Sequence, residues 1–444
     1  MHEDSVKSKY RNLLLGEFAF ITDGQHGYHE IDEDSPIALL TAKNAKGWFA
    51  NRIDAEPIAQ WVDDNNRRSS LQYNDIIVST RGSVGYCAIV KDKIAPANID
   101  QDVARVEILN NEVIPEYLLA YLNSTFGQDW FVRNSTGMVQ QGVSLAKLRL
   151  CSIPILSLDF QAKISEVIKK AHARIEESKA LYAEVENLLL DELGLRDWSP
   201  SSESISVKSF VESFAGTGRL DAEYYQPKYD ELFALMKASG YQIADLKDLI
   251  EPIKNGIDNR EFVEEGFPYI RVGDVKNGRI NLDSAVKIIP NKKESKDVKL
   301  DIGDILFTRK GSFGNAAVVK GSDLSAVISS EIMLLRLNEE NSNSILPEYL
   351  ALFFNSEIGF LQSERNAHGV AFYSISQDEL GRTQILVPSI EFQKDIKQNL
   401  NLSLEKQKQS KQLLEIAKRA VEVAIEDSEA AAMNWIDGQT KIGI

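Results

Sequence analysis

The chain has 444 residues, of which 43% are hydrophobic and 26% are charged. Its 50 lysines and arginines against 66 acidic residues give a formal net charge of −16. This acidic balance argues against a free-standing protein that coats nucleic acid without sequence preference, because such a protein needs a basic surface. It leaves open a protein that contacts DNA through local basic patches or as part of a larger complex.

The length and the terminal sequence further limit the classes of protein to which this chain could belong. The length predicts roughly two to four domains, at about 100–200 residues each. No apolar run approaches the ~18–20 residues that cross a bilayer, and the first residues lack the apolar core of a secretory signal. Two cysteines, Cys87 and Cys151, are too few for a disulfide framework. We therefore expect a cytoplasmic protein that does not bind membranes.

The sequence repeats itself at half length. The segment Asp75-Ile-Ile-Val-Ser-Thr-Arg-Gly-Ser-Val-Gly reappears from Asp304 as Asp-Ile-Leu-Phe-Thr-Arg-Lys-Gly-Ser-Phe-Gly, 229 positions further on. Two later matches, both 232 positions apart, are Pro115-Glu-Tyr-Leu with Pro347-Glu-Tyr-Leu and Asp159-Phe-Gln with Glu391-Phe-Gln. A nearly constant offset over more than eighty residues predicts a tandem duplication.

Each half is predicted to begin with a mixed segment, at residues 13–156 and 243–388. These segments contain short strand-like runs separated by glycine and asparagine. A short helix is predicted to start at Pro115 and again at Pro347. Proline is favoured there because the first turn of a helix has no internal partner for the N–H that proline lacks.

A long helix is predicted to end each half, since residues 159–193 and 391–429 contain no glycine or proline. Seam residues recur every three or four positions, which predicts a heptad pattern. The first seam is Phe160, Ile164, Val167, Ala171, Ile175, Ser178, Tyr182, Val185 and Leu189; the second, polar in its middle, is Phe392, Ile396, Leu400, Ser403, Gln407, Ser410, Leu414, Ala417, Val421 and Ala424. The favoured arrangement is an antiparallel pair of helices, each about 50 Å long. The alternative is that each helix packs only on its own domain.

Motifs of the common enzyme classes are missing or unconvincing. No phosphate-binding loop, nucleophile elbow or H-E-x-x-H zinc motif occurs, and His26 and His29 are interpreted as loop residues. Phe214-Ala-Gly-Thr-Gly is similar to a turn that holds S-adenosylmethionine, but no Pro-Pro loop follows it. The arrangement Asp283…Glu294-Ser-Lys could serve a nuclease, yet the same E-x-K spacing recurs on the first long helix. We predict no catalytic, metal-binding or cofactor-binding residue.

The duplicated turns are better suited to binding DNA. Each follows a strand and joins a cationic side chain to glycines that allow close approach, as a phosphate or guanine contact requires. A tight turn explains the glycines, but not an arginine at the same place in both copies. The predicted contact residues are Arg81, Gly82, Ser83, Arg309, Lys310, Gly311 and Ser312, with Gln140, Gln141 and His368 as weaker candidates. Segment 287–310, with seven basic and four acidic residues, is locally basic.

These features together resemble the DNA-specificity (S) subunit of type I restriction-modification systems, the HsdS family. The resemblance rests on two copies of G-D-I-L-x-[ST]-R-x-G, at residues 303–311 and, in variant form, at 74–82. Tyr269-Ile-Arg-Val-Gly-Asp-Val and, between the halves, Arg219-Leu-Asp-Ala-Glu-Tyr-Tyr-Gln-Pro also fit. The sequence departs from the family at the starts of the long helices, where a P-x-x-E-Q-x-x-I pattern is common.

The resemblance implies an α+β fold with two tandem-duplicated, mixed α/β target-recognition domains, separated by two long helices that pair as an antiparallel coiled coil. The implied order is target-recognition domain 1 at residues 1–156, long helix 1 at 157–194, a connector at 195–240, target-recognition domain 2 at 241–389, and long helix 2 with the tail at 390–444.

The resemblance also implies a function in restriction-modification and phage defence. Each domain would read one part of a bipartite site in double-stranded DNA, and the helices would set the unread gap. Two modification (methyltransferase) subunits and the restriction/translocase subunits would dock on the chain. They would carry S-adenosylmethionine, ATP and Mg²⁺, so this chain would hold no cofactor and catalyse nothing. Two alternatives stay open: a stand-alone nuclease or methyltransferase, and a coiled-coil adaptor of another defence system that does not read DNA.

Overall fold

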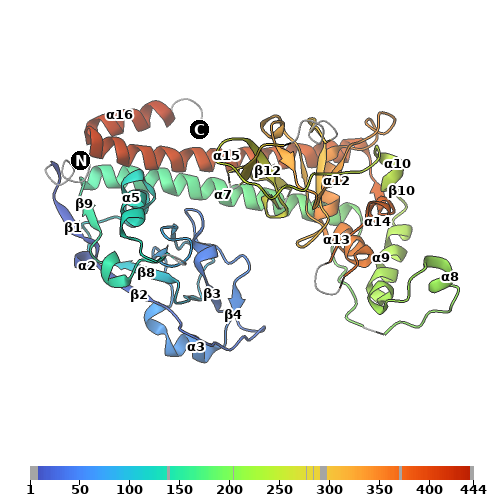
Figure 1. Ribbon diagram of the computed structural model, residues 1–444, viewed down its shortest axis with the longest axis horizontal. Helices are drawn as coiled ribbons and strands as arrows, with labels where there is room; N and C mark the ends of the chain where they lie inside the picture. The colour runs from blue at the N-terminus through green and yellow to red at the C-terminus, as the bar shows by residue number, and fades with distance from the viewer. Residues whose placement is uncertain are drawn as a thin grey trace. The chain divides into compact units, whose positions relative to one another are not determined.

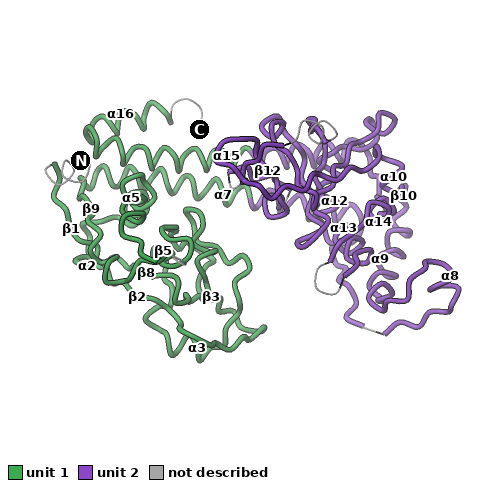
Figure 2. Tube along the Cα trace, in the orientation of Figure 1, with its two compact units in different colours: residues 1–178, 405–444 green, residues 179–404 purple. Residues whose placement is uncertain are grey.

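The computed structural model describes residues 9–137, 141–203, 205–276, 278–283, 285–290, 298–369 and 373–440. The chain divides into two compact units, which Figure 2 shows in different colours. Unit 1 comprises residues 1–178 and 405–444, and unit 2 comprises residues 179–404. Within the described ranges, no helix is both long enough and apolar enough to cross a membrane.

Unit 1 is built on a four-stranded antiparallel sheet in the order β2-β8-β5-β6. A smaller sheet, β4-β3-β7, and the pair β1-β9 complete its strands. The strands are β1 (Asn12–Leu14), β2 (Ala19–Asp23), β3 (Ala38–Leu40), β4 (Glu56–Pro57), β5 (Ile76–Ser79), β6 (Cys87–Ile89), β7 (Ala97–Ile99), β8 (Val103–Ile108) and β9 (Ser152–Pro154). Its shorter helices are α2 (Leu15–Phe18), α3 (Gln60–Asn65), α4 (Pro115–Asn123), α5 (Thr125–Asn134), α6 (Leu145–Leu148) and α16 (Glu429–Thr440).

Unit 2 repeats this plan with the sheet order β11-β19-β16-β17. A second sheet, β15-β12-β18, and the pairs β13-β14 and β10-β20 accompany it. The strands are β10 (Gln242–Asp245), β11 (Lys254–Asn255), β12 (Phe267–Ile270), β13 (Val275–Lys276), β14 (Arg279–Ile280), β15 (Val286–Ile288), β16 (Ile305–Thr308), β17 (Ala316–Val318), β18 (Val327–Ile328), β19 (Ile332–Leu335) and β20 (Gln384–Val387). Its shorter helices are α8 (Phe214–Thr217), α9 (Pro227–Ala238), α10 (Leu246–Leu249), α12 (Pro347–Asn355), α13 (Glu357–Asn366) and α14 (Gln377–Gly381).

The repeated aspartate of the duplicated motif is a folding residue in both units. Asp75 forms a buried ion pair with Arg105, with 2.6 Å between Oδ2 and Nε, and also accepts a hydrogen bond from a backbone N–H. Asp304 is bound in the same way by Arg336, at 2.7 Å. Both aspartate side chains are at most 3% exposed. These pairs fix the turn that leads into β5 and β16, so the aspartates are not available to a ligand.

The predicted Pro-Glu-Tyr-Leu helices are confirmed as α4 and α12, each with proline in its first turn. The Tyr117 hydroxyl donates to the carbonyl of Pro154, and the Tyr349 hydroxyl donates to that of Leu386. These bonds attach each helix to the strand that precedes a long helix. The tyrosines are fully buried. Their presence in both copies is therefore explained by packing in the core.

The glutamate and glutamine of the repeated motifs are also used in folding. Lys91 donates to the buried Glu116 at 2.6 Å, and Lys320 contacts Glu348 at 3.3 Å. Gln161 accepts from the N–H of Ile114, just before α4, and Gln393 makes the matching contact before α12. Each amide therefore satisfies a backbone group that the start of a helix leaves without a partner.

The long helices are α7 (Leu158–Glu192) and α15 (Ile390–Glu426). Within unit 1, the Ser410 hydroxyl donates to the carbonyl of Ala171 at 2.7 Å, and Lys406 contacts Glu177 at 2.8 Å. The partner numbers fall along α15 as they rise along α7, so the helices run antiparallel, side by side (Figure 1). The predicted antiparallel pairing is confirmed.

The same helix faces also join the domain cores. Phe160 and Ile164 of α7 lie in one core cluster with Tyr117 of α4 and with residues of the second half of α15. In unit 2, Val185 and Leu189 share a core with Ile396. Pairing and domain packing therefore occur together. The predicted domain boundaries remain predictions, since the compact units divide both long helices rather than setting them apart.

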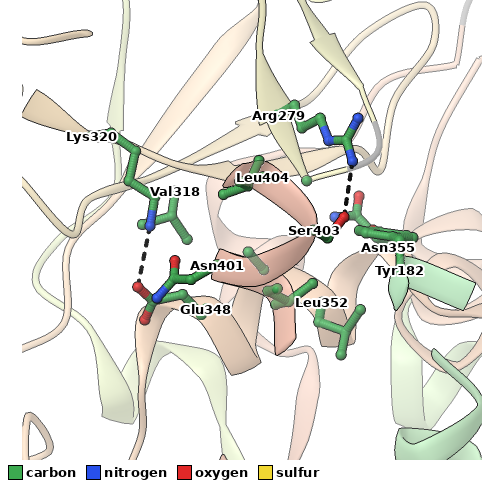
Figure 3. Close-up of a pocket in the computed structure, with 13 residues that line it drawn as sticks. Tyr182, Arg279, Val318, Lys320, Glu348, Leu352, Asn355, Asn401, Ser403 and Leu404 are labelled. Carbon is green, nitrogen blue, oxygen red and sulfur yellow. Dashed lines mark hydrogen bonds and ion pairs between the residues drawn. The ribbon is translucent and has the colours of Figure 1, made fainter. Parts of the chain in front are cut away.

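Unit 2 contains a small pocket, lined by both polar and apolar side chains, beside its part of the helix pair (Figure 3). Tyr182 of α7, Ser403 of α15 and Arg279 of β14 line it, and Arg279 donates to the Ser403 hydroxyl at 3.2 Å. Ser403 is one of the polar seam positions, and this hydrogen bond attaches α15 to strand β14.

Candidate nucleic-acid interface

In unit 1, β5 ends in a tight turn that presents Arg81 to solvent. Gly82 and Gly85 have left-handed backbone angles, with φ of +72° and +92°, which residues with a Cβ adopt only at a cost in free energy. At Gly85 a Cβ atom would also stand 3.1 Å from the ring of Phe131. The turn is therefore a rigid support for the Arg81 side chain, which is 46% exposed.

A second segment, residues 141–143, pairs with this turn. The N–H of Gly82 donates to the carbonyl of Gln141 at 3.0 Å, and the N–H of Val143 donates to that of Thr80 at 2.8 Å. Gly142 in turn exchanges backbone hydrogen bonds with Thr136. The two segments border a hollow of about 460 Å³. Its polar lining is Asp23, Thr80, Arg81, Gln101, Thr136, Gln141 and Ser144.

Unit 2 has the same arrangement around Lys310. The N–H of Gly311 donates to the carbonyl of Tyr373 at 3.2 Å, and the N–H of Ile375 donates to that of Arg309 at 3.0 Å. Ser374 exchanges backbone hydrogen bonds with His368. The turn after β16 and the loop around Ser374 thus form the second copy of the interface.

The register of these bonds corrects one prediction. Thr308 of β16 pairs with the first residue of β19, as Ser79 of β5 pairs with the first residue of β8. The structural equivalent of Arg81 is therefore Lys310, and Arg309 corresponds to Thr80. The two arginines do not occupy the same place in the two copies, because the second copy carries its arginine one residue closer to the strand.

Each of these cations has an acidic neighbour. The Arg81 guanidinium lies 3.4 Å from the Asp102 carboxylate, and the Lys310 ammonium lies 3.9 Å from that of Glu331. Next to Asp102, burial, assisted by the negative charge of Asp102, raises the pKa of Asp100 to about 6. Each exposed cation, Arg81 or Lys310, thus has a partly exposed carboxylate next to it.

Comparison with protein families identifies the chain. A family model described as the type I restriction modification DNA specificity domain matches residues 50–187 and 238–415, which together are more than two thirds of the sequence. The chain belongs to this family. The two matched segments contain one copy each of the duplicated turn.

Two curated relatives are specificity subunits from Escherichia coli. The chain is 26% identical over 132 residues to the type I restriction enzyme EcoBI specificity subunit, covering 30% of this chain and 27% of that protein. It is 22% identical over 258 residues to the EcoKI specificity subunit of strain K12, covering 54% and 48%. The chain thus spans about half or less of the length of these relatives. The S subunit of a type I restriction-modification system from M. genitalium matches with a TM-score of 0.41 and 15% identity, covering 94% of this chain and 95% of that one.

The remaining predicted contact residues have varied surroundings. The carbonyls of Ser83 and Ser312 accept hydrogen bonds from the hydroxyls of Ser79 and Thr308, which close the two turns. Gln141 is exposed beside Arg81. Gln140 lies outside the described residues, as do five of the eleven charged residues of segment 287–310: Lys292, Lys293, Glu294, Lys296 and Asp297.

His368 has a side chain that is 51% exposed, but other side chains already contact it. The imidazole of His368 contacts the carboxylate of Glu379 and lies 3.2 Å from the guanidinium of Arg219 in the connector. Arg309 is half-buried, and its Nε has no hydrogen-bond partner among the described residues. Lys310 therefore presents the more accessible charge of the second turn.

Aromatic side chains beside Lys310 were not predicted from the sequence. Phe313 stacks on Phe360 with 5.9 Å between ring centroids, and Tyr373 lies 6.1 Å from Phe313 and is 49% exposed. Exposed rings next to a cation are suited to stacking against bases or sugars. The sequence signal that could have found the acidic neighbours is the 229-residue spacing, which Asp102 and Glu331 share with the two turns.

The alternative enzyme motifs gain no support. Phe214–Thr217 forms a single helical turn that ends at Gly218, whereas a cofactor-binding turn would follow a buried strand. Of the nuclease pattern, Glu294 and Lys296 lie outside the described residues. His26 contacts Asp23 at 3.0 Å and His29 contacts Glu56 at 2.8 Å. The described part of the chain contains no group of three or more potential metal ligands.

Proposed function

We propose that this chain is the DNA-specificity subunit of a type I restriction-modification complex, and that its two domains read the two parts of a split DNA sequence. The observation that carries this proposal is the family match to both halves, each with its own copy of the cation-bearing turn. One turn per half suits a bipartite target, because each domain would contact its own segment of the duplex.

The chemistry of the turns supports DNA as the ligand. In the repeated motifs, the aspartate, glutamate, tyrosine and glutamine side chains are buried and used in folding. Arg81 and Lys310 are exposed on rigid turns. Long cationic side chains in that setting reach phosphate oxygens or the acceptors of a guanine edge. The motif therefore retains one solvent-facing charge that folding does not explain.

The paired helices would separate the two reading domains and provide the surface on which two methyltransferase subunits and the restriction/translocase subunits dock. Those partners would hold S-adenosylmethionine, ATP and Mg²⁺, and this chain would be a non-catalytic, cytoplasmic component without a cofactor of its own. Its net charge of −16 suits a subunit that closes around DNA only together with its partners, since an acidic surface alone repels the duplex.

The experiment that tests the proposal is a genome-wide map of methylated adenines in cells with and without this gene. We expect a two-part methylated sequence with an unread gap to disappear when the gene is deleted. An unchanged map would contradict the proposal. Methyl transfer to DNA by the purified chain alone, with S-adenosylmethionine, would instead favour an enzyme.

A further inference from the structure

Both units place a carboxylate beside the exposed cation, at equivalent positions. Asp102 immediately precedes β8 and Glu331 immediately precedes β19. They are 229 positions apart, which is also the separation of Arg81 and Lys310. The arrangement therefore repeats even though both side chains differ between the copies: arginine and aspartate in one, lysine and glutamate in the other. Charge and position are kept, whereas size is not.

The acidic residues are held by the same backbone framework as the cations. The N–H of Thr80 donates to the carbonyl of Asp102 at 2.8 Å, and that of Arg309 donates to the carbonyl of Glu331 at 2.9 Å. The residue next to each cation is thus bonded to the acidic residue itself. This bond fixes the backbone of the acidic residue next to the turn, and the ion pair with the cation places the carboxylate there.

Folding does not account for these pairs. Asp102 and Glu331 have side chains 34% and 48% exposed, and their partners are similarly open. Exposed ion pairs of this geometry contribute little to stability. If the turns served only to attract phosphates, an adjacent carboxylate would be unfavourable, because it repels the same phosphates. A role in choosing between ligands accounts for both charges.

A carboxylate and a cation together match the edge of a base pair. An arginine or lysine donates to the acceptors of guanine in the major groove, and an aspartate or glutamate accepts from the amino group of cytosine. Bases offer such amino donors, whereas the phosphate backbone offers only acceptors. A paired acid and cation can therefore bind a base edge while the cation alone would bind any phosphate.

We propose that Asp102 and Glu331 are specificity-determining residues: each carboxylate accepts a hydrogen bond from the amino group of a target base and weakens the attraction of the adjacent cation to phosphates of non-target DNA. This inference rests on the proposed function. It predicts that the acidic residues lower affinity for random DNA and raise the preference for the target.

The test uses the complex of the full chain with its methyltransferase subunits. The variants are Asp102→Asn and Glu331→Gln, which keep the side-chain shape and remove the charge. Glu112→Gln is the matched control, because Glu112 is an exposed acid paired with Arg11 at 2.8 Å, and neither residue belongs to a turn or lines the hollow beside Arg81. DNA affinity is measured over a series of salt concentrations. The two ligands are a random-sequence duplex and a duplex carrying the target sequence that methylation mapping identifies.

We expect the complexes carrying Asp102→Asn or Glu331→Gln to bind the random duplex several-fold more tightly than the complex with the wild-type chain. The slope of log K against log salt should steepen by about 0.9 for each phosphate gained. The target-to-random ratio should fall by about tenfold, the loss expected for one base contact. Adding Arg81→Ala to Asp102→Asn should abolish the gain on random DNA, whereas Glu112→Gln should behave as the unmodified complex.

Unchanged slopes and ratios in both variants would overturn the inference. Loss of binding to both duplexes, in variants that still assemble and unfold at the normal temperature, would also overturn it and assign the acids to holding the cations in place. Failure of the proposed function has a different signature, since the unmodified complex would then show no preference for any sequence.

Discussion

At the residue scale, the duplicated turns combine one exposed cation with side chains that are needed for folding. Replacing both Arg81 and Lys310 by alanine should weaken DNA binding by the assembled complex by at least tenfold, because two contacts to phosphate or base are lost. The salt slope should fall by about one unit for each phosphate contact removed. Binding titrations at several salt concentrations measure both effects.

The control for this double variant is Arg11→Ala, which removes an exposed arginine that neither belongs to a turn nor lines the hollow beside Arg81. It should leave affinity and slope within about twofold of the unmodified complex, as expected for a residue outside the interface. If the control weakens binding as strongly as the double variant, the turns are not the contact surface.

Asp100, also at the first turn, makes a prediction about pH. Burial raises its pKa to about 6 in the folded chain, from 3.8 ordinarily. A raised pKa means that the protonated form suits the fold, so the stability it contributes is present below pH 4 and is lost as the pH rises through 6. Asp100→Asn, which stays uncharged, should therefore be more stable than the unmodified chain at pH 7.5.

Urea unfolding midpoints at pH 7.5 and pH 5 test this sign. The advantage of Asp100→Asn should shrink at the lower pH, because Asp100 itself then becomes protonated. His29 and Asp102 lie close enough to interact with Asp100, so the comparison is made between variants at each pH. An advantage of equal size at both values would show that Asp100 is not the titrating group.

At the scale of elements, the start of α4 depends on a buried ion pair. Lys91 and Glu116 have side chains 4% and 2% exposed. Although burial disfavours the charge of Glu116, the Lys91 ammonium holds its pKa below the usual value. Lys91→Met should lower the free energy of unfolding by about 3–5 kcal/mol, because it leaves a buried carboxylate without its cation.

Equilibrium unfolding in urea measures this loss. Lys93→Met is the matched control, since Lys93 is 85% exposed and lies 3.6 Å from Glu176; it should cost less than about 1 kcal/mol. Adding Glu116→Gln to Lys91→Met should recover most of the stability. A double variant as unstable as the single one would show that packing, rather than the uncompensated charge, causes the loss.

The long helices could be predicted as elements because their signal lies along the chain. Heptad spacing and the lack of glycine and proline located α7 and α15 to within a few residues. The two short helices that start at proline, α4 and α12, could be predicted from the sequence equally well. The polar hydrogen bonds within the seam, such as Ser410 to the carbonyl of Ala171, were not, because no periodicity indicates which backbone group a serine faces.

At the scale of the whole molecule, the proposed spacer role predicts how the target changes with helix length. Removing residues 172–178 from α7 together with 404–410 from α15 takes one heptad from each helix and keeps both seams in phase. The helices shorten by about 10 Å, or about three base pairs of duplex. Methylation mapping should show the same half-sites with a shorter gap. Altered half-sites, or an unchanged gap in an active complex, would contradict the spacer role.

The net charge makes a second prediction at this scale. The isolated chain, at −16, should bind duplex DNA weakly, whereas the complex with methyltransferase subunits should bind strongly and lose affinity steeply as salt is raised. Fluorescence anisotropy with one labelled duplex compares the two directly. Equal affinity of the chain alone and of the complex would mean that the partners add nothing to the DNA interface.

The sequence by itself determined the duplication, the long helices and the resemblance to the family, because repeats, periodicity and motif spacing are all properties of linear order. It favoured the antiparallel pairing of the helices, which the contacts of Ser410 and Lys406 then confirmed. The tertiary structure decided which repeated residues are used in folding and which face solvent. It also brought Asp102 and Glu331 beside Arg81 and Lys310, two cations that the 229-residue offset already aligns. Such relations depend on strand register and on contacts between residues distant in the chain, which linear order does not encode.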